Sequence, residues 1–258
     1  MRLLVSLFLL FSLNGFASDN SDRVLDEYVF SPSESAIKDI DETLALAKAE
    51  NKLAMIVLGA QWCHDSRGLS AKFSNAQMHA LLKQHYKTLF VDVGFLEDKR
   101  HITQRFSYPG YFGTPTVLIV DPVSERLLNY ESISKWQSAD SVPSEEYIRY
   151  FSEYAEGEHL LESAQIKTPY LEQIQRFEQI QIQRLFEAYS KLGPLLKSYK
   201  EDTLESDDVF NDAWVEVRKF RSQLQQDLIS LRQQARLQQA SNQSTPLVLP
   251  EYAEFLHL

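Results

Sequence analysis

A run of six apolar residues, Leu53 to Leu58, leads within four residues into the sequence Trp62-Cys63-His64-Asp65-Ser66, which holds the only cysteine of the 258-residue chain. So short an apolar run is typical of a buried strand. Where a strand runs into a helix, the first helical turn presents free N–H groups and the positive end of the helix dipole, which favour an anion. Thiols at helix N-termini ionise more readily than free cysteine, and the thiolate is the nucleophile. Cys63 is therefore the candidate nucleophile.

A second apolar run begins some fifty residues later, in the segment 113–119, Gly-Thr-Pro-Thr-Val-Leu-Ile. Together, the two motifs resemble the thioredoxin superfamily. The first resembles its active-site turn with the second cysteine replaced by Ser66, and the second resembles the strand entry that carries its cis-proline. The resemblance implies that Thr114 and Pro115 contact the substrate beside the thiol. It also implies that Trp62 flanks the site as a partly exposed substrate contact.

The other residues of the motif define a single-thiol site. Ser66 can offer a hydrogen bond to a thiolate, but it cannot attack a mixed disulfide, so another thiol must resolve it. His64 is either a cation that tunes the thiolate or a solvated turn residue, and Asp65 suits a helix N-terminus while opposing a thiolate by charge. The family usually has a buried acid at the position of Val57, and the absence of that acid argues further against dithiol reductase activity. The alternative is that the cysteine is buried and inert.

The first seventeen residues have the layout of a secretory signal peptide. Met1-Arg2 precedes an apolar stretch from Leu3 to Phe11, and Gly15-Phe16-Ala17 places small residues before a cleavage point at Ser18. The apolar run is shorter than the roughly 20 residues that a spanning helix needs. We therefore expect export to a bacterial periplasm or beyond the cell, without stable membrane insertion after cleavage. In an exported protein, one leftover cysteine indicates a free reactive thiol or pairing between chains.

Composition excludes several other classes of function. The formal net charge is −10, which argues against nucleic acid or an anionic membrane as a partner. One cysteine and six scattered histidines show no metal-ligand spacing, so no metal site is expected. The sequence also has no glycine-rich phosphate loop, and no cofactor is predicted.

Hydrophobic spacing predicts alternating strands and helices, and their order resembles the thioredoxin fold. The resemblance implies an α/β domain over residues 33–165, with a mixed central sheet flanked by helices, after an N-terminal extension at 18–32. A strand, a crossover helix and a second strand imply a parallel pair. The expected elements are a helix over 37–47, a strand over 53–58, a helix over 63–73, a helix from 74 or 75 to Tyr86, a strand over 88–93, a short helix over 98–106, a strand over 116–120, its antiparallel partner over 126–130 and a helix over 144–163.

Residues 166–240 form a helical extension with no counterpart in the basic fold. Two segments with apolar residues at three- and four-residue spacing predict an antiparallel helical hairpin, which Gly193-Pro194 should kink or break in its first helix. The hairpin either packs on the domain or extends from it. It is either a stabilising cap or a surface for a protein partner or self-association, the latter helped by polar pairs such as Gln225-Gln226. In the tail, residues 241–258, an apolar group from Leu247 to Leu256 is expected to dock back.

Two classes of function follow. The first is an exported thiol–disulfide protein that forms mixed disulfides with client protein thiols or a small thiol through Cys63, acting as a monothiol oxidoreductase or isomerase-like factor. The second is a redox-inactive binding or adaptor module that keeps the peptide groove and uses the helical extension. Alkylation kinetics of Cys63 at neutral pH distinguish the two.

Overall fold

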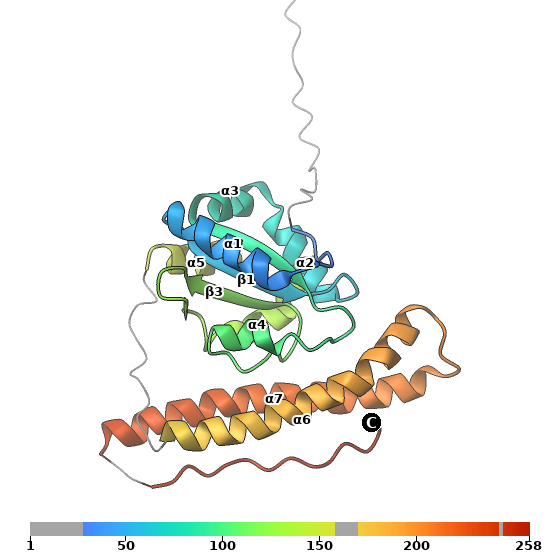
Figure 1. Cartoon of the computed structure of the whole chain (residues 1–258). Coiled ribbons are helices and arrows are strands. Elements are labelled where there is room, and N and C mark those ends of the chain that lie inside the picture. Colours follow the sequence, from blue (N-terminus) through green and yellow to red (C-terminus); the bar gives the residue numbers. More distant parts are fainter. Residues whose placement is uncertain (1–27, 158–169, 243–244) are drawn as a thin grey trace, which may run out of the picture.

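A computed structural model describes residues 28–157, 170–242 and 245–258 (Figure 1). Two sequence-based predictions, the signal peptide at 1–17 and the domain boundary near residue 165, lie outside the described residues. No helix in the described ranges is both long and apolar enough to cross a membrane.

Four strands form one mixed sheet, in the order β2-β1-β3-β4. β1 (Leu53–Gly59) pairs in parallel with β2 (Tyr86–Asp92) and antiparallel with β3 (Thr116–Asp121), which in turn pairs antiparallel with β4 (Arg126–Leu127). β1 is buried on both faces, because its alternate side chains enter two different hydrophobic clusters. The parallel pair, the antiparallel hairpin and the predicted α/β class are confirmed.

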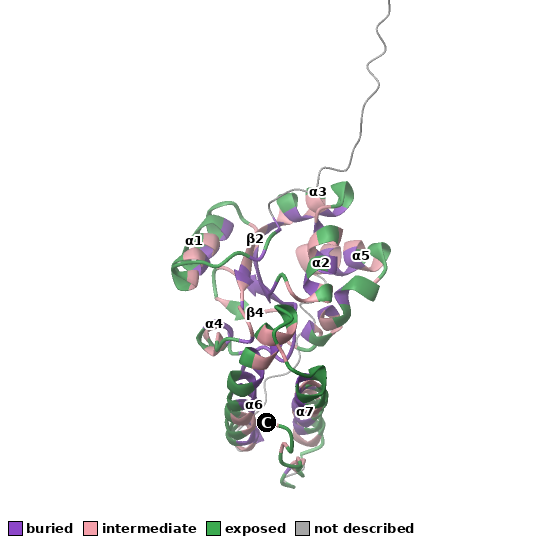
Figure 2. Cartoon of the chain, turned by 90° about the vertical axis from the view of Figure 1, so that its right-hand side faces the viewer, coloured by how far each residue is buried: buried purple, intermediate pink, exposed green. Residues whose placement is uncertain are grey.

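Helices cover both faces of the sheet (Figure 2). α1 (Ala36–Ala49) and α4 (Arg100–Arg105) pack on one face, through residues such as Leu44 and Ile102. α2 (His64–Phe73), α3 (Ala76–His85) and α5 (Ser144–Ala155) pack on the other, together with a 3-10 helix, η1 (Ile133–Ser141), that buries Trp136. α2, which begins directly after Cys63, therefore lies in a layer with α3, α5 and η1, on the face of the sheet opposite α1.

Three predicted boundaries are wrong. Tyr86 does not extend α3 but begins β2, where its hydroxyl donates to the Phe151 carbonyl. α5 ends at Ala155 rather than reaching 163, and Gly157 follows with φ of 79°, a left-handed conformation that stops a helix. β4 is shorter than predicted, because the Asn129 side chain replaces the next backbone pairing: it accepts from Ile119 N–H and donates to the Val117 carbonyl.

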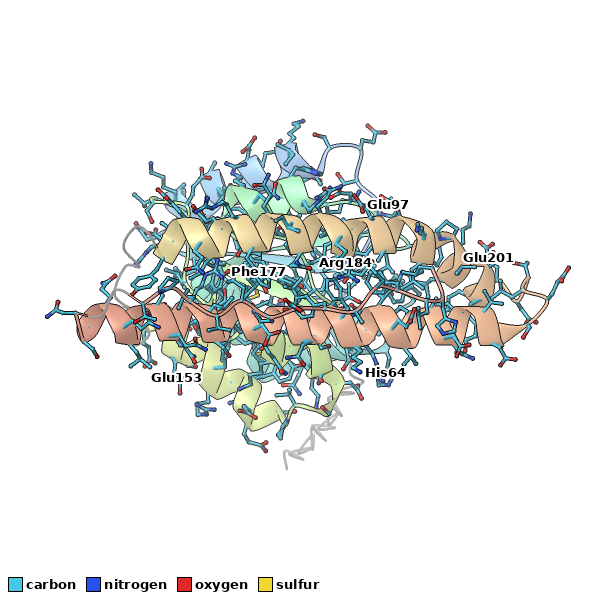
Figure 3. All side chains as sticks on the ribbon, turned by 90° about the horizontal axis from the view of Figure 1, so that it is seen from below. His64, Glu97, Glu153, Phe177, Arg184 and Glu201 are labelled. Atoms are coloured by element: carbon cyan, nitrogen blue, oxygen red, sulfur yellow. The ribbon has the colours of Figure 1, made fainter. Side chains whose placement is uncertain are left out.

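The C-terminal helices α6 (Tyr170–Lys200) and α7 (Asp207–Ala240) form the predicted hairpin, and it packs on the domain (Figures 1 and 3). Its apolar face belongs to the same hydrophobic cluster as Ile56 and Leu58 of β1. α6 continues through Pro194 without breaking, and Figure 1 shows it bending over its last turns. Gly193 is required there, because a Cβ atom would lie 2.2 Å from the Phe95 carbonyl oxygen.

The tail docks along the hairpin. Leu247 is buried, and its backbone N–H and carbonyl bond the Gln173 side chain at 3.1 and 2.7 Å. Tyr252 packs its ring against Phe177 and Phe220. Leu249 and Phe255 also pack against this cluster, with the Phe255 ring against Phe220. The predicted docking is thus confirmed for these four side chains, whereas Val248 and Leu256 are exposed. The tail joins the two helices of the hairpin to each other.

Candidate functional site

Cys63 is the N-cap residue of α2, directly after the loop that leaves β1. Its backbone is extended, and its carbonyl accepts the N–H of Arg67 at 3.2 Å, which begins the helical ladder. The half-buried thiol donates a hydrogen bond of 3.2 Å to the Thr114 carbonyl oxygen. The peptide bond between Thr114 and Pro115 is cis, as predicted. Two motifs fifty residues apart in the sequence therefore meet at one sulfur atom.

Ser66 lies beneath this turn, and its side chain is fully buried. Its hydroxyl accepts a hydrogen bond of 3.4 Å from the Ala60 N–H. The structure therefore pairs Ser66 with the backbone after β1 and pairs the Cys63 thiol with Thr114, whereas we predicted a bond between the Ser66 hydroxyl and the sulfur. Val57 is buried in β1 within the cluster that includes Leu69 of α2, so an apolar side chain fills the place of the family's acid.

His64 and Asp65 both contact Asp140 of η1. The Asp65 carboxylate accepts the Asp140 N–H at 3.1 Å, which ties η1 to the first turn of α2. His64 Nε2 lies 3.6 Å from the Asp140 carboxylate, and its side chain is 72% exposed. Of the two roles predicted for His64, this exposure favours the solvated turn residue.

Trp62 is half-buried, and two consecutive hydrogen bonds connect its indole to Asp92. Its indole N–H donates to the Gly94 carbonyl at 2.7 Å, and the Gly94 N–H donates to Asp92 at 3.0 Å. Burial raises the pKa of Asp92 above its ordinary value, and the Gly94 hydrogen bond opposes that shift. Asp92 ends β2, directly opposite Gly59 of β1. An acid on the neighbouring strand thus positions the tryptophan of the motif.

The helical hairpin reaches the same tryptophan, which the sequence analysis did not predict. Trp214 of α7 lies edge-on against Trp62, and Phe95 stacks on the Trp62 ring at a centroid distance of 6.5 Å. The Arg221 guanidinium covers the Trp214 ring at 5.0 Å. In sequence, Trp214 has the helical spacing of a core residue, and nothing in that spacing indicates that it meets the motif.

The hairpin also holds the loop that precedes the cis-proline. Tyr189 of α6 donates its hydroxyl to the Phe112 carbonyl at 3.0 Å. Gln225 of α7 is buried and bonds both Gln137 of η1 and the Tyr108 hydroxyl. The prediction that Gln225 lies on an outer polar face is wrong, because its amide satisfies polar groups buried between the hairpin and the domain.

These contacts enclose a pocket of about 580 Å³ at the thiol. The domain contributes Trp62, Cys63, Thr114 and Gln137, and the hairpin contributes residues from both α6 and α7. Figure 3 shows the two helices side by side across the domain, with His64 beside α7. The volume lies within the roughly 300–1,000 Å³ of small-molecule sites. Within the described residues, no group of three or more His, Cys, Asp or Glu side chains could hold a metal ion.

A family model described as thioredoxin-like matches residues 35–122. No curated protein sequence matches the chain. Among solved structures, a disulphide isomerase from Xylella fastidiosa Temecula1 is similar at 23% identity and a TM-score of 0.44, over 49% of this chain and 97% of that one. The order of the strands, the cysteine at the start of α2 and the match to the family model together identify a thioredoxin-like domain in this part of the chain.

Proposed function

We propose that the protein is a thiol–disulfide exchange protein that forms mixed disulfides through Cys63. One observation carries the proposal: the Cys63 sulfur lies at the N-terminus of α2, beside the Thr114 carbonyl and the cis-Pro115 peptide bond, and opens into a pocket. Backbone N–H groups at a helix start stabilise a thiolate, which is the reactive form. In the resting state the thiol proton forms a hydrogen bond to the Thr114 carbonyl oxygen, and formation of the thiolate releases it to solvent.

The exchange step balances without a cofactor. The Cys63 thiolate attacks one sulfur of a disulfide, a new Cys63–sulfur bond forms, the old disulfide bond breaks, and the departing thiolate takes a proton from water. Cys63 is oxidised in the adduct, and the departing thiol is reduced. Ser66 cannot reverse the step from within, because a hydroxyl is no nucleophile toward a disulfide at neutral pH. A second thiol, from a client protein or a small molecule, must therefore release the adduct.

A redox-inactive binding module is the second candidate. The observation in its favour is that apolar Val57 and buried Ser66 occupy the positions where the family has its acid and its second cysteine. In that case the pocket would hold a partner without turnover. The rate of Cys63 alkylation by iodoacetamide at pH 7 separates the two, because a module of this second kind should have a thiol no more reactive than that of an unstructured cysteine peptide.

Export remains part of the proposal, with cleavage before Ser18. It rests on the apolar run and the small residues of the N-terminal segment. Intact-mass analysis of the protein from the periplasm of an expressing bacterium checks it. A mass that includes Met1 would remove the argument for an oxidising compartment.

The test of the exchange function is adduct formation at the single cysteine. The protein is mixed with a small disulfide at neutral pH, and its mass is followed with time. We expect one adduct per chain that persists until an external thiol is added, and none for Cys63→Ser. A wild-type protein that stays unmodified under conditions in which a cysteine peptide reacts would overturn the proposal.

A further inference from the structure

The walls of the Cys63 pocket are positively charged, although the chain as a whole is strongly acidic. Four cationic side chains line it: Arg67 from α2, Lys200 at the end of α6, and Arg218 and Arg221 from α7. Asp65 is the one carboxylate among the lining residues. The chain carries a formal net charge of −10, so this local excess of cations runs against its average.

Among the residues that the structure describes, these four cations have no carboxylate partner. Within the described residues, none of them has an acidic oxygen within 4.0 Å, a distance at which many other cations of the chain are paired. The paired arginines outside the pocket are Arg100, Arg105, Arg149, Arg184, Arg232 and Arg236. Charges left unpaired around one cavity attract an anionic ligand, because a cleft lined by one sign of charge concentrates the opposite sign.

Two of the arginines are held in place by uncharged groups. Arg67 donates to the Gln61 carbonyl at 2.7 Å, and Arg221 lies over the Trp214 ring. Arg221 also hydrogen-bonds the Tyr189 hydroxyl. A guanidinium has five N–H donors, so each arginine keeps further donors for a carboxylate, which it can bind in a bidentate manner. Arg218 is exposed at the rim and has no such contact. The pocket therefore presents two oriented donors, Arg67 and Arg221, and the further positive charges of Lys200 and Arg218 beside the nucleophile.

The size and the aromatic wall of the pocket favour a small ligand over an extended protein segment. Its volume of about 580 Å³ suits a molecule of a few residues. Trp214 closes one side by its contact with Trp62, and Phe210 and Tyr199, stacked at 4.3 Å, line the hairpin side. A client strand that entered from this side would have to displace α7.

We propose that the pocket selects a small disulfide that carries carboxylates, such as the disulfide of a short acidic peptide thiol, with glutathione disulfide as the probe. The inference rests on the proposed exchange function and adds its substrate class. Cys63 attacks one sulfur of the disulfide, the bound half stays as the mixed disulfide with its carboxylates against the arginines, and the other half leaves as a thiol. The oxidant is the disulfide itself.

The experiment compares three disulfides of different charge on the full chain. Second-order rates of Cys63 modification are measured by mass spectrometry for glutathione disulfide, which is anionic, bis(2-hydroxyethyl) disulfide, which is neutral, and cystamine, which is cationic. Each rate is divided by that of a cysteine peptide with the same disulfide, which removes intrinsic reactivity. We expect the anionic probe to be favoured over the neutral one, and the cationic probe to be disfavoured. The preference should shrink between about 0.01 and 1 M salt, as the Debye length falls from roughly 30 to 3 Å.

Arg218→Gln is the informative variant, because the side chain is exposed and its loss leaves no buried gap. It should slow reaction with glutathione disulfide about fivefold, the effect of one charge near 4 Å in water, and slow reaction with the neutral probe by a clearly smaller factor. Arg67→Gln should also slow the reaction with glutathione disulfide more than the reaction with the neutral probe. Arg176→Gln is the matched control: Arg176 is also exposed and bonds only the Glu172 carbonyl, but it lies on α6 outside the pocket.

The outcomes separate the two proposals. Selection by charge would be wrong if the three probes reacted at equal normalised rates. It would also be wrong if Arg218→Gln slowed the neutral probe as much as glutathione disulfide. Neither result would contradict the exchange function. Failure of all three probes to modify Cys63 would remove the exchange function itself. Faster reaction with a disulfide on an unfolded protein than with glutathione disulfide at equal concentration would overturn the small-ligand assignment.

Discussion

Trp214, on the second helix of the hairpin, lies edge-on against Trp62, with ring centroids 6.3 Å apart and planes at 83°. Edge-to-face pairs of this kind contribute about 0.5–1.5 kcal/mol beyond the area they bury. Trp62 is the residue directly before the nucleophile, so the hairpin is part of the wall of the site. It is not merely a cap on a distant surface.

Removal of this wall should expose the thiol. In Trp214→Ala we expect faster alkylation of Cys63 by iodoacetamide, by a few fold, and a loss of stability of about 2 kcal/mol, within the usual range for a half-buried side chain. Trp214→Phe keeps an aromatic contact and should retain most of the protection. An alanine variant that reacts at the wild-type rate would show that the contact does not limit access.

A second cysteine should convert the site to dithiol chemistry. Residues 63 and 66 are three apart across the first turn of α2, where Cβ atoms are about 5–6 Å apart. We expect Ser66→Cys to form an internal disulfide under oxidising conditions and to gain activity in an insulin-reduction assay. The gain should be modest, because Val57 supplies no acid for proton transfer. Mass analysis that finds both thiols free after oxidation would contradict the thioredoxin-like geometry of the turn.

Gly193→Ala tests the contact between α6 and the loop after β2. The added methyl group would meet the Phe95 carbonyl oxygen at 2.2 Å, which is a backbone atom and cannot swing away. We expect a loss of about 1–3 kcal/mol, the usual cost of overpacking, in denaturant unfolding. Lys191→Ala, an exposed change on the same helix, should be nearly neutral. Equal denaturant midpoints for the two variants would mean that α6 can move away from the Phe95 carbonyl without loss of stability.

A chain ending at Gln165 should no longer fold to the native domain. From sequence we expected such a chain to remain folded, because residues 33–163 contain every element of the basic fold. In the structure, Tyr111 stacks on Tyr189 and the Tyr108 hydroxyl accepts from Gln225, so truncation uncovers buried aromatic surface. We expect strong binding of a hydrophobic dye and loss of the near-UV circular dichroism signal. A cooperative thermal transition without dye binding would show that residues up to 165 fold as an independent domain.

Asp92 should make stability depend on pH. Its pKa is raised above the ordinary 3.8 by burial, so the folded state binds the proton more tightly than the unfolded state. That contribution is present below pH 3.8 and is lost as the pH rises through the higher, folded pKa. Asp92→Asn, which keeps an oxygen for the Gly94 N–H, should therefore gain stability relative to wild type between pH 3.5 and pH 7. A constant difference across that range would contradict this reading of Asp92.

Much of the domain could be predicted from local pattern. The apolar run of β1 and the turn at Cys63 follow from short segments whose residue types have local causes. The cis bond before Pro115 was expected from the resemblance of its segment to the thioredoxin superfamily. The ends of elements were harder to predict. β4 stops because the Asn129 side chain pairs with Ile119 and Val117, and no single-segment pattern shows such a replacement.

The wall of the site could not be predicted, because it is made by contacts between distant segments. Trp214 and Gln225 have the spacing of a helix face, and that spacing does not indicate which surface the face meets. In the described part of the chain, no carboxylate lies within 4.0 Å of Arg218 or Arg221. This could not be predicted either, since a sequence does not reveal which acidic side chains lie close to an arginine. The helical spacing of apolar residues predicts a hairpin. Only the three-dimensional structure shows that this hairpin lines the pocket at Cys63.

The docked tail also determines when this protein can finish folding during its synthesis. Leu247 is buried with the same hydrophobic cluster that includes Leu58 of β1, so that cluster cannot be complete until both have left the ribosome. At about 5–20 residues per second, the interval between them is roughly 10–40 s. For that time the cluster on this face of the sheet lacks part of its cover, and the nascent chain can meet a chaperone before it meets its own C-terminal segment.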